Sequence, residues 1–78
     1  MLRHLSADEL RSIGNAGASL EVSASIYTVE DLVLIAQAMA GGATLRIWDS
    51  NALNAEQMET IAAAAPGVVT FTGIYPPQ

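Results

Sequence analysis

The side chains that could carry out acid–base or nucleophilic chemistry are few and stand far apart. The chain has one histidine, His4, and no cysteine. His4 lies close to the amino terminus, where we expect an exposed side chain and not a catalytic base. One imidazole without thiolates does not make a structural zinc site. We therefore predict no metal site and no cofactor.

Asp49 and Ser50 are the best candidates for a reaction. They follow a predicted strand, and ligand sites of α/β proteins form at such strand ends. A small hydrolase that uses Asp49 or Ser50 is therefore one hypothesis. No base is evident near Ser50, however, and an Asp-Ser-Asn sequence is ordinary turn chemistry. The adjacent carboxylates at 8–9 and 30–31 are explained by helix first turns. We predict a protein that is not an enzyme.

The elements that must position these side chains come from a threefold repeat. The segments Leu5–Leu10, Tyr27–Leu32 and Leu53–Met58 each place a capping residue after an apolar one and an acid or amide three positions later. Serine, threonine and asparagine side chains accept a hydrogen bond from an unpaired amide at a helix start. The residue three positions on can bond back to the cap, and the flanking apolar pair forms a hydrophobic staple. We expect a capping box at Ser6 with Glu9 and looser versions in the other two units.

An alternating run follows each predicted helix, after small or helix-breaking residues at 14–17, 41–42 and 66–67. A period of two with β-branched and aromatic residues is typical of strands. The residues expected to point inward are Leu20, Val22, Ala24 and Ile26, then Leu45 and Ile47, then Val69 and Phe71. The residues expected to point outward are Glu21, Ser23 and Ser25, then Arg46 and Trp48, then Thr70 and Thr72.

The order of elements predicts an α/β fold. Three helix–strand repeats, at about residues 5–26, 27–52 and 53–75, form one domain over residues 1–78. Strands joined through a helix are parallel, with right-handed crossovers. We expect a short parallel three-stranded sheet with the helices on one face.

The middle of the chain resembles a known family. The run Leu45-Arg46-Ile47-Trp48, followed by Asn51-Ala52-Leu53, resembles the strand and turn asparagine of leucine-rich repeats, with one extra residue in the turn. The helical half that follows is similar to the ribonuclease-inhibitor-like subclass, with Leu53-Asn54, then Met58, Ile61, Ala64 and Ala65. The resemblance implies a solenoid that binds proteins on its exposed strand face, without catalysis. The first turn has Ser25 and Ile26 in place of the asparagine, and no polar end cap is evident. The resemblance fits either a minimal relative of the leucine-rich-repeat family or a convergent α/β repeat.

The outward-facing strand residues form the predicted protein-binding surface. Glu21, Arg46 and Thr70 are expected in one row across the strands, and Ser23, Trp48 and Thr72 in the next. A tryptophan with an arginine and small hydroxyl residues around it is typical of a site that dominates binding energy. Alternatively, Trp48 only covers the sheet or folds over the turn after it. Glu21 and Arg46 are expected to form a cross-strand pair.

Composition narrows the class of partner. The net charge is −5, and 14% of the residues are charged, against about 25% in an average domain. The acidic balance argues against a nucleic-acid partner. The low charge favours a protein partner and a homo-oligomer, assembled through strand edges or the open sheet face. An acidic inhibitor that blocks the basic surface of a nucleic-acid-processing enzyme is the alternative. Since no apolar run is long enough for a signal peptide or a membrane span, we expect a cytoplasmic protein without a membrane partner.

Overall fold

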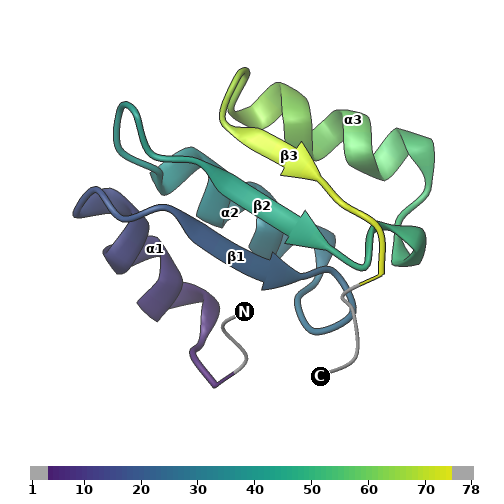
Figure 1. Cartoon of the computed structure of the whole chain (residues 1–78), viewed down its shortest axis with the longest axis horizontal. Coiled ribbons are helices and arrows are strands. Elements are labelled where there is room, and N and C mark those ends of the chain that lie inside the picture. Colours follow the sequence, from purple (N-terminus) through teal and green to yellow (C-terminus); the bar gives the residue numbers. More distant parts are fainter. Residues whose placement is uncertain (1–3, 75–78) are drawn as a thin grey trace.

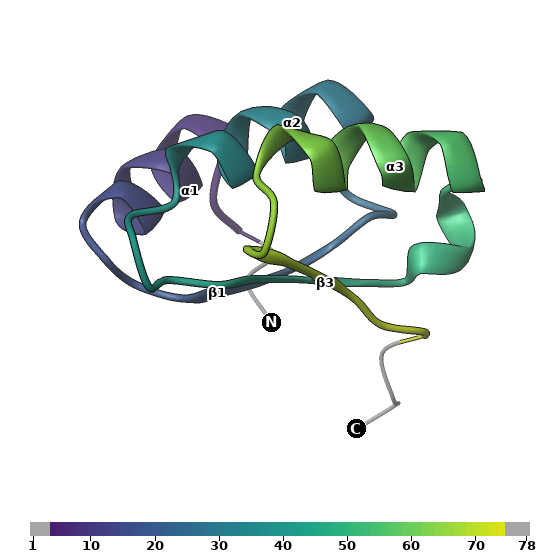
Figure 2. The ribbon, with the colours of Figure 1, turned by 90° about the horizontal axis from the view of Figure 1, so that it is seen from above.

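The computed structural model describes residues 4–74. In this structure three helices pack on one face of a three-stranded parallel sheet, as the repeat predicts (Figure 1). The elements are α1 (Ala7–Asn15), β1 (Leu20–Ser23), α2 (Val29–Ala38), β2 (Leu45–Trp48), the short 3-10 helix η1 (Ser50–Ala52), α3 (Ala55–Ala64) and β3 (Val69–Phe71). The strand order is β1-β2-β3, and both pairs are parallel. No element of the described chain covers the other face of the sheet (Figure 2). The α/β class and the layer arrangement are thus confirmed.

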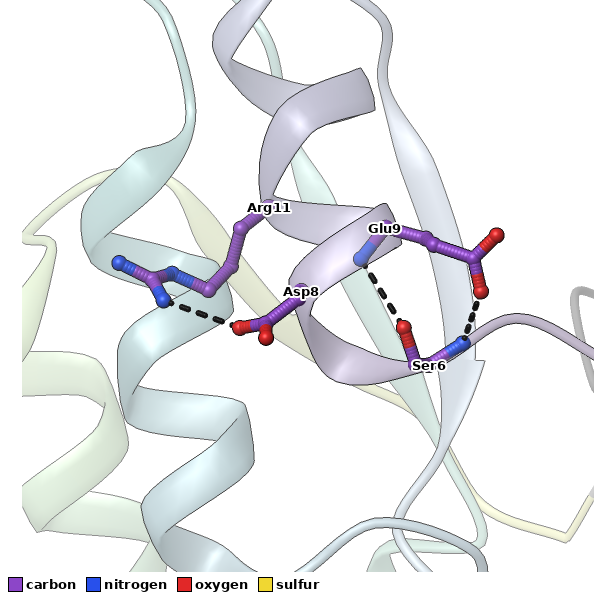
Figure 3. A network of polar contacts seen from close by, with 4 residues as sticks. All are labelled: Ser6, Asp8, Glu9 and Arg11. Carbon is purple, nitrogen blue, oxygen red and sulfur yellow. Dashed lines mark hydrogen bonds and ion pairs between the residues drawn. The ribbon is translucent and has the colours of Figure 1, made fainter.

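The helices begin at the predicted capping residues. At α1 the Ser6 hydroxyl accepts from the Glu9 backbone N–H at 3.2 Å, and Glu9 Oε1 accepts from the Ser6 N–H at 2.9 Å (Figure 3). The hydrogen bonds with the Ser6 backbone and side chain lower the pKa of the Glu9 carboxyl. Asn54 and Gln57 form an equally complete box at α3, so the expectation of a looser one was wrong. At α2 only the bond from the Asp31 N–H to Thr28 forms, because aspartate is one methylene shorter than glutamate.

The core lies between the two layers and is filled by the inward rows of the strands. Leu20 pairs with Leu45, and Leu45 with Val69, so equivalent positions of the repeats stand side by side. The inward residues of β1 and β2 are buried, together with Leu10, Leu32, Ile35 and Ile61 from the helices. Val69 and Phe71 on β3 are only partly buried. The predicted inward rows are therefore confirmed for these strands, with less cover at β3.

The first strand is shorter than predicted. It ends at Ser23, and residues 24–26 form a turn in which the Ile26 N–H bonds to the Ser23 carbonyl at 3.2 Å. The Ser23 hydroxyl accepts from the Ser25 N–H, and such side-chain bonds compete with a strand ladder. Ile26, predicted to point inward, is 43% exposed as a result. Ala24 is buried, as expected.

Helix α1 continues through Gly14, which was predicted to belong to its stop. A Cβ atom at this position would lie 2.6 Å from Met39 Sδ, so the missing side chain lets the chain after α2 approach closely. The turn itself is made at Gly17, whose φ of 112° is in the left-handed region that glycine tolerates.

The helix layer is wider than the sheet. Packed helices need about 8–10 Å between their axes, whereas paired strands lie about 4.8 Å apart. Figure 1 accordingly shows α1 beyond β1 and α3 beyond β3, with α2 behind the sheet. Both strand edges therefore have a helix overhanging them on the covered side.

Tyr27 joins the starts of the first two helices. Its hydroxyl donates to the carbonyl oxygen of Leu5 at 2.6 Å, and its side chain is 8% exposed. Burial raises the pKa of the Tyr27 phenol, and the negative charges of Asp31 and Glu9 add to the shift.

We expect Tyr27→Phe to lower the free energy of unfolding by about 0.5–1.5 kcal/mol at neutral pH, because the Leu5 carbonyl loses its donor. The difference should shrink as the pH rises above 10, the ordinary pKa of the group. There the unfolded tyrosine ionises before the folded one, so the stability that the neutral phenol contributes is lost. Urea unfolding from pH 7 to 11 measures both effects. Tyr75 is present in both proteins, so its ionisation cancels in the difference between them. Parallel pH dependences of the free energy of unfolding would contradict the role given to the Tyr27 phenol.

Candidate protein-binding face

The open face of the sheet brings most of the predicted binding residues together. Glu21 pairs with Arg46, and Arg46 with Thr70, so the first predicted row is present. Ser23 pairs with Trp48, and Thr72, just past β3, donates its N–H to the Ile47 carbonyl at 2.8 Å. Glu21, Arg46 and Thr70 are exposed, and Trp48 and Thr72 are half-buried.

Trp48 is the centre of a small cluster on this face. Its indole Nε1–H donates to Glu21 Oε1 at 2.7 Å. Glu21 lies on the neighbouring strand, two residues before Ser23, which is the register partner of Trp48. The ring therefore extends from β2 toward β1. The Arg46 guanidinium carbon stands 5.8 Å from the ring centroid, within the range of a cation–π contact. An aromatic ring, a carboxylate and a guanidinium are thus held next to one another.

The predicted ion pair between Glu21 and Arg46 does not form. The two residues are register partners, but the one salt bridge among residues 4–74 joins Arg11 to Asp8. The indole is the reason, because its N–H occupies the carboxylate and its ring attracts the guanidinium. Arg46 consequently has no carboxylate within 4 Å in the described part of the chain.

Ser23 does not belong to the accessible surface, contrary to the prediction. It is 0% exposed, and its hydroxyl lies 2.7 Å from that of Ser25. The same hydroxyl donates to the carboxylate of Asp49. The end of β1 turns here while Asp49 reaches across from the end of β2, so polar neighbours surround Ser23. A partner on this face has no access to it.

Asp49 and Ser50, the two residues of the hydrolase hypothesis, take part in the hydrogen bonds around this turn. Asp49 has φ 57° and ψ 40°, a left-handed conformation that aspartate adopts more readily than most residues. Its N–H bonds to the Gly73 carbonyl at 2.8 Å, and the Ser50 N–H bonds to the Thr72 carbonyl at 3.2 Å. These bonds and the link to Ser23 give Asp49 a role in joining three strand ends. Sequence reasoning missed this role, although an acid directly after a strand and the Ser-x-Ser pattern at the end of β1, Ser23 and Ser25, were the available signals.

Charge is divided unevenly between the two layers. Six carboxylates and one arginine lie on the helices: Asp8, Glu9, Arg11, Glu30, Asp31, Glu56 and Glu59. Their net charge of −5 equals that of the whole chain. All three helices run in the same direction, so the five first-turn carboxylates come to one edge of the molecule (Figure 1). On the open face Glu21 and Arg46 cancel.

No group of three or more histidine, aspartate or glutamate side chains within residues 4–74 is placed to hold a metal ion. On the helix side, an open hollow is lined by Asp8, Arg11, Ser12, Asn15 and Ala38. Asp8 and Arg11 pair with each other there at 3.2 Å.

We expect Ser23→Ala to lower the free energy of unfolding by about 1–3 kcal/mol, because it removes the buried hydroxyl that donates to the Asp49 carboxylate and accepts from the Ser25 amide. Urea denaturation measures the change. Ser12→Ala, on the exposed side of α1, is the control and should cause no loss. A Ser23→Ala protein as stable as the wild type would show that this network contributes nothing.

Trp48 is the single tryptophan of the chain, so its fluorescence reports the cluster directly. We expect Glu21→Ala to shift the emission maximum to longer wavelength, because the indole loses its acceptor and gains contact with water. Glu59→Ala removes an equal charge from an exposed position on α3 and should leave the spectrum unchanged. Equal spectra for all three proteins would rule out the indole–carboxylate bond in solution.

The chain matches no protein-family model, no curated protein and no solved structure.

Proposed function

We propose that the chain is a small non-catalytic protein-interaction module that binds its partner on the open face of the sheet. The observation that carries the proposal is the cluster of Trp48, Arg46 and Glu21 on a face that no element of residues 4–74 covers. Tryptophan and arginine are the residues most enriched at the energetic centre of protein interfaces.

The cluster is already ordered before any partner arrives. The bond to Glu21 and the contact with Arg46 restrict the rotamers of all three side chains, and the strands beneath them are fixed by the core. A rigid anchor loses less conformational entropy on binding. This supports Trp48 as a contact residue of the proposed interface.

The open face is favoured over the strand edges as a docking surface for a folded partner. A second sheet that paired with β3 would carry its own helices on one side. Since α3 already lies beyond β3, a helix of the partner on that side would collide with it (Figure 1). Natural proteins screen their sheet edges in this way. An extended peptide carries no helices and would not meet this obstacle.

A leucine-rich-repeat-like solenoid is the finer description of the fold that we propose. Apolar residues at equivalent positions of the repeats stand side by side across the strands, with Leu20 beside Leu45 and Leu45 beside Val69, which supports it. The turn after β2 departs from the family pattern, because Asn51 is exposed within the 3-10 helix η1. No helix within residues 4–74 is long and apolar enough to cross a membrane. A cytoplasmic location is part of the proposal.

An acidic inhibitor is the second candidate function, and the charge distribution is its specific support. Five first-turn carboxylates at one edge would suit a basic surface such as that of a nucleic-acid-processing enzyme. In that case the helix edge, and not the open face, would contact the partner.

Photo-crosslinking separates the two candidates. A crosslinking amino acid in place of Thr70 reports the open face, and one in place of Glu59 reports the helix layer. We expect the partner to crosslink from position 70. Trp48→Ala should then raise the dissociation constant of the purified complex about tenfold or more. Its circular dichroism spectrum should stay that of the wild type.

Crosslinking from position 59 alone would contradict the proposal and favour the acidic inhibitor. The salt dependence gives a second reading, because exposed charges are screened over about 3 Å at 1 M salt. A complex that survives such salt does not depend on the acidic edge.

A further inference from the structure

We infer that the open face binds a second copy of this chain, in a twofold-symmetric dimer held by reciprocal ion pairs between Arg46 and Glu21. This inference names the partner of the proposed interaction face and so rests on the proposed function.

Unused bonding capacity on both residues is the first observation. The Arg46 guanidinium is exposed and stands over the Trp48 ring, with no carboxylate within 4 Å among residues 4–74. Glu21 is exposed too, and only its Oε1 takes the indole N–H. A guanidinium has five donors, so Arg46 can bind a carboxylate while it remains over the ring.

The placement of the two residues is self-complementary. Glu21 and Arg46 are register partners on β1 and β2, so they lie at the same height along the strands. A twofold axis can run parallel to the strands in the space between the two sheets, above the midpoint between β1 and β2. This axis places each Glu21 opposite Arg46 of the second copy. Two sheets packed face to face lie about 10 Å apart, a gap that a long arginine and a glutamate bridge together. Such an interface uses the same patch on both copies and closes at two.

Charge restricts where two copies can meet. Each carries −5, and this charge lies on the helices, on the far side of a molecule whose shortest extent is 19 Å. Exposed charges are screened over about 8 Å at physiological salt, so the two helix layers would hardly repel each other in this arrangement. On the open face Glu21 and Arg46 offer one charge of each sign, which makes this pair of residues complementary to the same pair on a second copy.

The dimer should be weak. A standard interface buries about 800 Å² on each partner, which is roughly a fifth of the 4435 Å² surface of this chain. Strands of four residues extend only about 13 Å, so the open face supplies less than that. Interfaces at the small end of the range belong to transient complexes. We therefore expect the dimer to form only at high protein concentrations, up to about 1 mM.

Charge reversal tests the inference. Sedimentation equilibrium from about 10 µM to 1 mM should show a monomer–dimer equilibrium for the wild type. Glu21→Arg and Arg46→Glu should each raise the dissociation constant about tenfold or more, because like charges then face each other. The double variant Glu21→Arg/Arg46→Glu restores opposite charges at both contacts and should return to within about threefold of the wild type.

Matched controls exclude effects of net charge and of folding. Glu59→Arg makes the same charge change as Glu21→Arg but on α3, and it should not weaken the dimer. Circular dichroism checks each variant. If a reversal fails to fold, Glu21→Gln and Arg46→Gln each remove one partner of the pair and should weaken the dimer in the same direction.

A wild type that stays monomeric at about 1 mM would overturn the inference. A dimer that is indifferent to both reversals would overturn it too, since the copies would then meet elsewhere. So would a double variant that stays monomeric while correctly folded. None of these results removes the proposed function, which fails only if crosslinking from position 70 and the Trp48→Ala effect are absent.

Discussion

The different widths of a helix and a strand govern the shape of this protein. Three helices at about 8–10 Å spacing cannot sit within a sheet whose strands are about 4.8 Å apart, so the outer two lie beyond the sheet edges (Figure 1). Each overhanging helix hinders a folded neighbour whose helices lie on the same side from pairing with the strand beneath it. The helices all lie on one side, and the described chain leaves the other face of the sheet bare. The surface most open to a folded partner is therefore a consequence of packing geometry.

The distribution of charge follows from the way the helices begin. Acidic residues are favourable in the first turn because they face the positive end of the helix dipole. Five such residues serve that local purpose here, and the parallel direction of the helices brings them to one edge. The helices thereby carry a net charge of −5, whereas Glu21 and Arg46 on the strand face cancel each other. Features that stabilise single helices thus determine which surface can approach another acidic protein.

Competition for a single carboxylate decides the chemistry of the open face. Glu21 has two neighbours that can donate to it, Arg46 in the same row and Trp48 in the next. The indole N–H takes it, and the guanidinium turns to the indole ring. The ion pair expected inside the molecule is then missing, and charges of both signs stay exposed. The same residues that would have satisfied each other are left with bonding capacity for a partner.

Local patterns in the sequence determined the helix starts, the alternation of the strands and the row of Glu21, Arg46 and Thr70. These depend on residues three or four positions apart and on the repeat itself, which sets equal positions side by side. Only the tertiary structure decided that Ser23 is buried under Asp49, 26 residues away, and that Glu21 accepts from Trp48, 27 residues away. Such contacts join different strands and the turns that follow them, and several partners compete within reach at the same time. Alternation says which face a side chain is on, but burial and pairing on that face depend on how neighbouring strands end.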